Sequence, residues 1–312
     1  MSVSGLRSIE RRVVGRNVWL SRTGENAHDA LARLAVHEIR PDVLATEEAV
    51  GQAMLAELRD AARNKAGDLV IILLGGRGAQ ALHRRLGELA RTGAADELLG
   101  RLRVFTQDAL APMRLASGLS FVRDFERLLG TDFFNKIKSF TSMRTHTDDL
   151  AGELARYIEQ LEALGGIDIF FLGLGPEPDA AAHLAYIKPG SGAQATDVAG
   201  LIPISESILE HHVAKFKVGG STVTAADEAE CRAATHILTL GPAAILRARR
   251  VVQSIVDAST APAKRASYRR VRATEIAHDP AARAAQLDEN PGLWARLHPN
   301  FRSLVLPDVL VT

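Results

Sequence analysis

An aliphatic run at residues 68–74, Asp-Leu-Val-Ile-Ile-Leu-Leu, constrains the fold of this chain more than any other segment. Six consecutive apolar residues leave no polar face, so the run predicts a short strand that is buried on both sides. Comparable runs recur along the chain and are separated by helical patterns, at residues 102–106, 167–172, 236–240 and 303–306. The alternation predicts an α/β fold, with a mostly parallel, Rossmann-like sheet and helices on both faces.

Three helices follow from local patterns. The first covers about residues 79–91, directly after the glycine-rich turn at residues 75–78. The second is expected to begin with Thr147 as its cap, because apolar residues then recur at helical spacing as far as Leu161. The third is expected from Gly241-Pro242 through about Val256.

Two segments stand apart from this α/β pattern. Residues 1–45 are expected to form an N-terminal extension that packs on the edge of a domain spanning residues 46–312. A segment at about residues 259–291 resembles an insertion rich in Ala, Pro and Arg, with Arg265, Arg269, Arg270 and Arg272. Such a cluster could contact phosphate, or it could form a solvated helix face.

Composition narrows the partners and the compartment. The chain carries 38 basic and 37 acidic side chains, so its net charge of +1 favours neither nucleic acid nor an acidic membrane as a partner. Cys231 is the single cysteine, which excludes an intrachain disulfide and suits a reducing compartment. Since no apolar run approaches the ~20 residues that span a bilayer and the first residues lack a signal-peptide core, we expect a cytoplasmic protein.

The segment at residues 167–191 is the most informative about function. Its apolar strand ends at Gly173 and Gly175, where a ligand can approach the backbone without meeting a Cβ atom. Asp179, His183 and Lys188 follow, and these three proton-handling groups would lie outside the carboxyl end of a strand, the usual ligand site of an α/β sheet. An ordinary strand-to-helix loop with solvated polar residues is the alternative.

Two other strand ends carry candidate groups. Gly75, Gly76, Arg77 and Gly78 form a turn that opens a helix, where unpaired N–H groups and a guanidinium would suit an anion. The turn matches neither a P-loop nor a dinucleotide fingerprint. Asp108 follows the next strand and is placed as a base, although it could simply form the turn before Pro112.

Other chemistries find little support. His211 and His212 are adjacent and would point apart, and no third ligand stands at a useful spacing, so we expect no metal. No Gly-x-Ser-x-Gly elbow is present, which argues against a serine hydrolase. No cofactor is expected.

Several of these segments resemble the glucosamine-6-phosphate deaminase family. Phe105-Thr-Gln-Asp108 resembles that family's strand-end Phe-x-x-Asp. Residues 172–191, with Gly173, Gly175, Asp179, His183, Ala185-Tyr186 and Pro189-Gly-Ser191, are similar to Gly-x-Gly-x-Asp-Gly-His-x-Ala-Phe-x-Glu-Pro-Gly-Ser. Similar stretches follow at residues 217–228, 237–241 and 297–299, so the likeness spans roughly residues 45–308. The same superfamily includes 6-phosphogluconolactonases and sugar-phosphate-binding regulators.

The resemblance implies roles for the candidate residues. Asp108 would be the base that transfers the proton at C2, His183 would open the sugar ring, and Asp179 would be its neighbour. The turn at residues 75–78 would hold phosphate. Lys188 stands where the family has the acid that partners the histidine, so it is expected to lower the pKa of His183.

Other departures from the family affect the phosphate site. The hydroxyl-bearing turn Gly-Gly-Ser/Thr-Thr-Pro is replaced here by Gly-Gly-Arg-Gly-Ala, and the lysine expected after Gly241 is missing. The expected function is therefore a sugar-phosphate isomerase or deaminase with an altered substrate. The alternatives are a 6-phosphogluconolactonase-like hydrolase and a non-catalytic sensor of sugar phosphates. The expected partner is a small phosphorylated sugar, and a homo-oligomer is left open.

Overall fold

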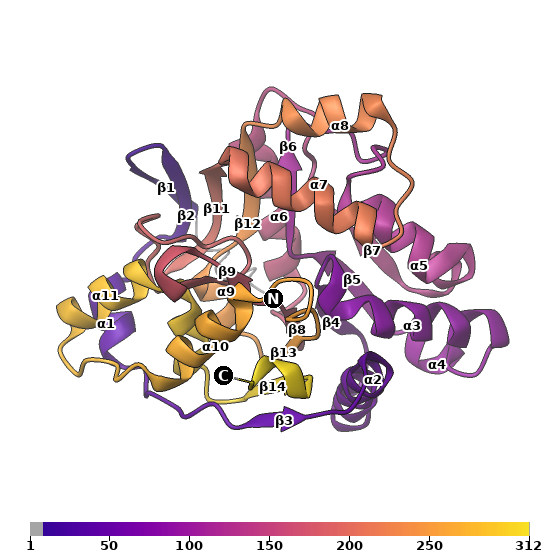
Figure 1. Cartoon of the computed structure of the whole chain (residues 1–312), viewed down its shortest axis with the longest axis horizontal. Coiled ribbons are helices and arrows are strands. Elements are labelled where there is room, and N and C mark those ends of the chain that lie inside the picture. Colours follow the sequence, from indigo (N-terminus) through magenta and orange to yellow (C-terminus); the bar gives the residue numbers. More distant parts are fainter. Residues whose placement is uncertain (1–8, 312) are drawn as a thin grey trace, which may run out of the picture.

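The computed structural model describes residues 9–311, which build two sheets with helices around them (Figure 1). The larger sheet has seven strands, and every pair of neighbours in it is parallel. Its strands, in spatial order, are β3 (Pro41–Val43), β14 (Phe301–Val305), β13 (Arg250–Ile255), β8 (Ile169–Leu172), β4 (Leu69–Leu73), β5 (Leu102–Thr106) and β7 (Ser139–Thr141). The expected α/β fold with a mostly parallel sheet is confirmed.

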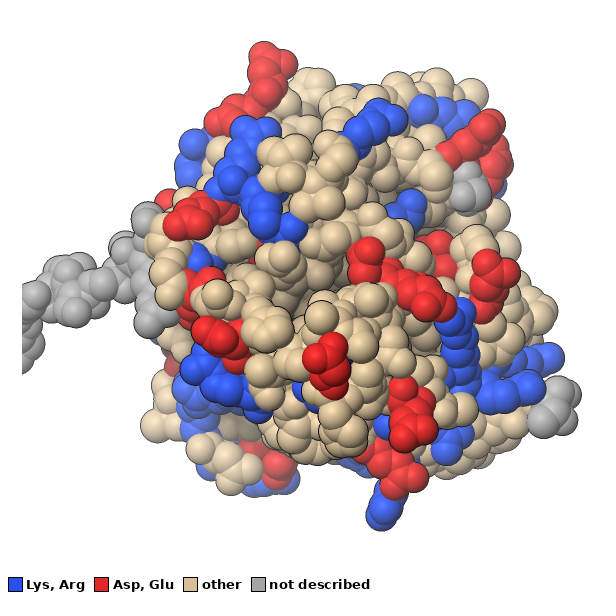
Figure 2. All heavy atoms as spheres, turned by 90° about the vertical axis from the view of Figure 1, so that its left-hand side faces the viewer, with Lys and Arg blue, Asp and Glu red and all other residues tan. Residues whose placement is uncertain are grey.

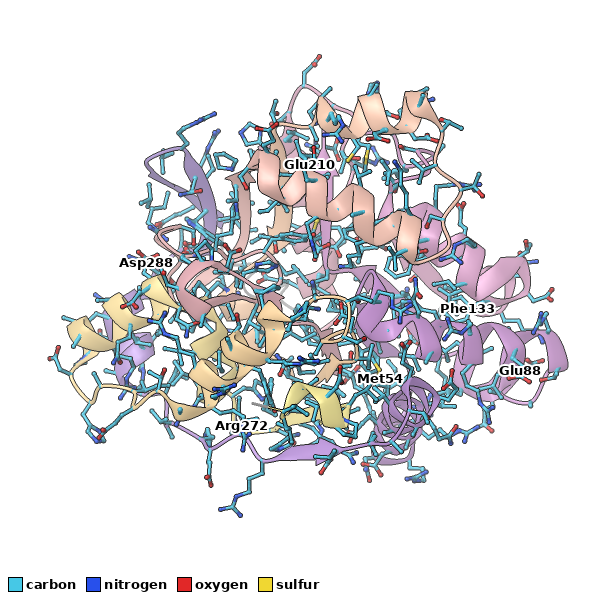
Figure 3. All side chains as sticks on the ribbon, viewed as in Figure 1. Met54, Glu88, Phe133, Glu210, Arg272 and Asp288 are labelled. Atoms are coloured by element: carbon cyan, nitrogen blue, oxygen red, sulfur yellow. The ribbon has the colours of Figure 1, made fainter. Side chains whose placement is uncertain are left out.

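Helices cover both faces of this sheet, as the fully apolar strands require. Within β4, Val70 and Ile72 belong to one core, whereas Leu69, Ile71 and Leu73 belong to the other. The first core also holds residues of α6 (Leu150–Ala163), α9 (Pro242–Leu246), α10 (Ala263–Ala273) and α11 (Pro280–Glu289). The second core holds residues of α2 (Glu47–Asn64), α3 (Gln80–Thr92) and α5 (Phe121–Lys136), including Met54 and Phe133 (Figure 3).

The smaller sheet is antiparallel throughout and determines where the candidate base lies. It contains β1 (Ile9–Val14), β2 (Asn17–Arg22), β11 (Asp197–Pro203), β12 (His236–Leu240) and β6 (Asp108–Ala111). Because β5 ends at Thr106 and β6 begins at Asp108, the chain passes from one sheet to the other across Gln107. The backbone N–H of Leu240 donates to the Gln107 carbonyl at 3.1 Å and fixes this crossing.

Two helices connect β11 to β12, namely α7 (Glu206–Val218) and α8 (Ala225–Arg232). Glu210 on α7 is ion-paired with Arg232 of α8, and Figure 3 shows Glu210 beside α8. The remaining elements are α1 (Ala27–Ala32), α4 (Asp96–Leu99), the short hairpin of β9 (Gly175–Pro176) and β10 (Ala182–His183), and four 3-10 turns at Arg77–Ala79, Pro178–Ala180, Pro291–Leu297 and Pro307–Val309.

Three expectations about single elements are wrong. The helix expected through Val256 ends at Leu246 and is followed by β13, because this apolar stretch pairs between β8 and β14 in the centre of the sheet. A short apolar run does not distinguish a buried helix from a buried strand. The strand expected at residues 236–240 is present as β12, but its expected place in the parallel sheet was wrong, because it pairs in the antiparallel sheet. The cap of α6 is Asp149, whose side chain accepts from the N–H of Gly152, so the expected cap at Thr147 was two residues too early.

Residues 9–45 and 259–291, from the two segments that stand apart in the sequence, contribute strands and helices to the fold, whereas residues 1–8 lie outside the described part of the chain. The β1–β2 hairpin pairs with β11, and β3 pairs with β14 at the edge of the large sheet. Residues 259–291 contain α10 and α11, whose arginines contact protein atoms: Arg265 donates to the Asp308 carbonyl at 2.8 Å, and Arg270 donates to the Asp179 carbonyl at 2.7 Å. Arg272, labelled in Figure 3, donates to the Ile39 carbonyl.

The distribution of surface charge and the length of the helices are relevant to nucleic acids and membranes as partners. On the face shown in Figure 2, Lys and Arg side chains lie among Asp and Glu side chains. Within residues 9–311, no helix is long and apolar enough to cross a membrane.

Candidate active site

A cavity of about 460 Å³ lies at the carboxyl ends of the parallel strands. Four strands supply lining residues just after their ends: Leu74, Gln107 and Gly173 directly follow β4, β5 and β8, and Asp257 is the second residue after β13. Helices α7 and α10 supply further lining residues, including Lys215 and Lys264. This is the position at which α/β sheets usually bind ligands, and the volume suits a small metabolite.

Asp108 is the carboxylate on the strand side of this cavity. It is the first residue of β6, only 3% of its surface is exposed, and it lines the cavity. Burial raises the pKa of Asp108 to about 6, although a hydrogen bond from the Gln107 amide and the charge of Lys215 both act in the opposite direction. The carboxyl group therefore exchanges its proton close to neutral pH, as a general base requires.

His183 is held by a carboxylate that the sequence did not single out. Nδ1 of His183 lies 2.6 Å from Oε1 of Glu177, so the imidazole donates this hydrogen bond and its Nε2 is left to accept a proton. Burial lowers the pKa of His183, and Glu177 partly offsets the effect. The ring packs so closely on β9 that a Cβ at Gly175 would lie 1.9 Å from Nε2, which explains the glycine.

Two lysines, on helices α7 and α10, bring positive charge to the cavity. Lys215, on α7, packs against the glycine-rich turn: a Cβ at Gly76 would lie 2.5 Å from its Nζ atom. Burial lowers the pKa of Lys215. Lys264, the second residue of α10, is ion-paired with Asp257 at 2.6 Å. His211 stands one turn before Lys215 on α7 and also lines the cavity; burial lowers its pKa to about 4.

The structure brings some of the expected residues together and leaves others outside the lining of this cavity. Asp108 and His183 line it, as do Gly75, Gly78, Gly173 and Gly175. Arg77 and Gly76 are not lining residues, and the Arg77 guanidinium is ion-paired with Glu47 of α2.

Asp179 and Lys188 also lie outside the lining. Asp179 sits in the turn after Glu177 with its carbonyl bound to Arg270, and Nζ of Lys188 lies 3.5 Å from Oγ of Ser205. The expected cause of the lowered pKa of His183 was therefore wrong, because burial and the charges of Lys215 and Lys264 lower it, not Lys188.

Sequence reasoning missed Glu177, Tyr186, Lys215 and Lys264 as lining residues. Lys215 stands four residues after His211, a spacing that places both on one helix face, so a helix prediction for this stretch would have linked them. The resemblance led us to expect a lysine early in the helix after Gly241. Lys264 stands in a similar context, early in the helix that follows β13. The mistaken helix over β13 hid this correspondence.

The fold and the cavity define a Rossmann-like α/β protein with a polar site at its strand ends, and similar solved structures exist. A monomeric glucosamine-6-phosphate deaminase superposes with a TM-score of 0.64 at 20% identity, covering 87% of this chain and 98% of the other. The 6-phosphogluconolactonase from Trypanosoma brucei gives a TM-score of 0.58, also at 20% identity and with the same coverage. These likenesses show the fold.

Short segments also match curated relatives. A glucosamine-6-phosphate deaminase from Phocaeicola vulgatus is 32% identical over 71 residues, which are 22% of this chain and 26% of that protein. One from Bacteroides fragilis is 46% identical over 43 residues, 14% of each chain. The matched segments thus span about a quarter or less of these relatives. No family model matches the chain. The resemblance to glucosamine-6-phosphate deaminases and 6-phosphogluconolactonases is confirmed, and the relatives are enzymes of sugar phosphates.

Proposed function

We propose that this protein is an enzyme that isomerises a phosphorylated sugar between its aldose and ketose forms, with or without release of an amino group. The observation that carries the proposal is one cavity lined by a buried carboxylate, Asp108, by a carboxylate-bound imidazole, His183, and by the ammonium groups of Lys215 and Lys264. These groups supply a base, a second acid/base and an anchor for an anion.

Asp108 is the group for the C2 proton. With a pKa of about 6, its carboxyl group is ionised at neutral pH yet basic enough to accept a proton from carbon next to a carbonyl. It would take the C2 proton of the open-chain sugar and return it to C1. While a proton passes from the C2 hydroxyl or amine to O1, these two steps convert the C1 aldehyde into a hydroxymethyl group and leave a carbonyl, or an imine that water hydrolyses, at C2.

His183 is the group for ring opening. Its neutral imidazole holds a proton on Nδ1, toward Glu177, so Nε2 can accept a hydroxyl proton from the cyclic sugar and later release it. The Glu177 carboxylate stabilises the imidazolium that forms meanwhile. In this proposal Glu177 takes the positioning role, whereas the catalytic roles expected for Asp179 and Lys188 stay predictions from the sequence.

The phosphate would lie between the turn at residues 75–78 and Lys215. The close packing of Lys215 on Gly76 places a half-buried ammonium at the turn, and Gly75 and Gly78 line the same cavity. Within residues 9–311 no carboxylate is ion-paired with this ammonium, and a charge removed from water without a partner is costly, so an anionic ligand would satisfy it. The Arg77 guanidinium already pairs with Glu47, and the proposal therefore assigns the main anion contact to Lys215.

The test is exchange of the C2 hydrogen with deuterated solvent, using glucosamine 6-phosphate and glucose 6-phosphate as probes. The wild type should exchange at least one of them, and Asp108→Asn should abolish exchange while binding persists, because an amide of the same shape cannot take the proton. Binding without exchange in the wild type would favour a sensor. The neutral imidazole of His183, held by the Glu177 carboxylate, could also activate water, so hydrolysis of 6-phosphogluconolactone without exchange would favour a lactonase.

A further inference from the structure

Tyr186 reaches the cavity through a backbone conformation that is unusual for a residue with a side chain. Ala185 and Tyr186 have φ angles of 46° and 57°, in the left-handed region. The turn is closed by the N–H of Ile187, which donates to the Leu184 carbonyl at 2.7 Å. Non-glycine residues persist in this region where the surroundings hold them, and such positions concentrate at functional sites.

The turn lays the Tyr186 ring over the imidazole of His183. The two rings are stacked, with centroids 5.1 Å apart and an angle of 14° between their planes. Only 9% of Tyr186 is exposed, and the residue lines the cavity together with Asp108 and His183. Stacking alone needs only the ring, which phenylalanine would supply equally well, and phenylalanine stands at this position in the deaminase segment that residues 172–191 resemble.

The hydroxyl of Tyr186 is unlike those of the other two tyrosines. Tyr157 donates to the Thr106 carbonyl at 2.5 Å, and Tyr268 shares a hydrogen bond of 2.8 Å with Ser303. Among residues 9–311, by contrast, no residue forms a hydrogen bond with the Tyr186 hydroxyl. The hydroxyl oxygen retains some exposed surface, and Tyr186 lines the cavity. Since a nearly buried phenol usually finds a partner, the open one indicates a ligand atom.

The Tyr186 hydroxyl remains protonated at neutral pH. Burial raises the pKa of Tyr186 far above its ordinary value, and the negative charge of Asp108 raises it further. The phenol is thus a neutral hydrogen-bond donor, and it lines the same cavity as Asp108, whose charge acts on it.

We infer that the Tyr186 hydroxyl is a further catalytic group that donates a hydrogen bond to the substrate oxygen on which charge develops. This inference rests on the proposed function. When Asp108 takes the C2 proton, the C2–H electron pair forms a C1–C2 double bond, and the π electrons of the C1 carbonyl move onto O1. A donor aimed at O1 is worth more as this oxygen becomes negative, so it lowers the barrier rather than merely binding the sugar.

The experiment compares wild type with Tyr186→Phe in the exchange of the C2 hydrogen of glucosamine 6-phosphate. The variant retains the ring on His183 and loses only the hydroxyl. We expect kcat to fall on the order of 100-fold, the effect of removing one such donor, while KM changes little. Its Tm should not fall, because the hydroxyl has no protein partner to lose.

Tyr268→Phe is the matched control, because its hydroxyl pairs with Ser303 outside the cavity and the variant should keep the wild-type kcat. An unchanged kcat in Tyr186→Phe, or a rise in KM alone, would overturn the inference and leave the isomerase proposal standing. Absence of exchange in the wild type itself would reject the proposed function, and the inference with it.

Discussion

Glu177 and His183 are joined by a hydrogen bond of 2.6 Å that the short β9–β10 hairpin makes possible. His183 pairs across this hairpin with Gly175, and Glu177 follows β9 directly, so two residues six positions apart meet side by side. In the resembling deaminase segment the acid follows the histidine, at the position of Lys188. In this chain the acid that contacts the histidine, Glu177, precedes it in the sequence.

The first prediction concerns this pair. Glu177→Gln should lower kcat by about tenfold or more, within the contribution of a positioned acid/base group, because the imidazolium loses its carboxylate. The pKa of His183 should fall further, since Glu177 is the group that raises it. Rates with glucosamine 6-phosphate and an NMR titration of the histidines measure both effects.

Asp179→Asn is the informative comparison for that variant. Asp179 lies two residues beyond Glu177 and outside the cavity lining, so its neutralisation should change neither kcat nor the titration of His183 substantially. A greater loss in Asp179→Asn than in Glu177→Gln would restore the assignment made from the sequence.

Local patterns were sufficient to predict four of the seven strands of the large sheet and part of the site. Strands β4 and β8 are apolar throughout, β5 is apolar at three of its five positions, and all three end at recognisable turns, so Asp108, Gly173 and His183 could be assigned to strand ends. Parallel strands present these ends at one edge of the sheet, and for that reason residues distant in sequence were expected to lie together.

The remaining lining residues depend on contacts that no local pattern contains. Lys215 reaches the turn at Gly76 only because α7 packs over it, and Glu177 meets His183 only through the β9–β10 hairpin. The guanidinium of Arg77 was expected to bind an anion, but α2 brings Glu47 within ion-pairing distance. Tertiary packing, not the identity of the turn residues, decides which cation faces the cavity.

A second prediction concerns pH. Since Asp108 must be ionised to take a proton and its pKa is about 6, kcat/KM should rise with pH through about 6 and then level off.

The raised pKa of Asp108 also determines how the stability of the folded protein changes with pH. The folded state holds the proton of Asp108 more tightly than the unfolded state does, so the stability contributed by this group falls as pH rises from about 4 to about 6. Asp108→Asn should therefore raise Tm more at pH 7.5 than at pH 4. An equal change of Tm at both pH values would contradict the buried, raised-pKa carboxyl group.

The third prediction separates the anion contact from the general charge of α7. Lys215→Met removes a half-buried ammonium at the cavity, so affinity for glucosamine 6-phosphate should fall by on the order of 1.5–3 kcal/mol, the range for hydrogen bonds to charged groups. Lys217→Met is the matched control: it lies two residues further on the same helix, and its ammonium pairs with Glu228 outside the cavity. Isothermal titration should show nearly unchanged affinity for this control.

The same substitution should stabilise the ligand-free protein although it weakens ligand binding. Burial lowers the pKa of Lys215, which means that the folded state disfavours its charge, so Lys215→Met should raise Tm in the absence of ligand while it weakens binding. Arg77→Ala completes the comparison, because its guanidinium is paired with Glu47 and its loss should affect stability more than affinity. A larger loss of affinity in Arg77→Ala than in Lys215→Met would move the phosphate away from α7 and onto the turn residue first expected to hold it.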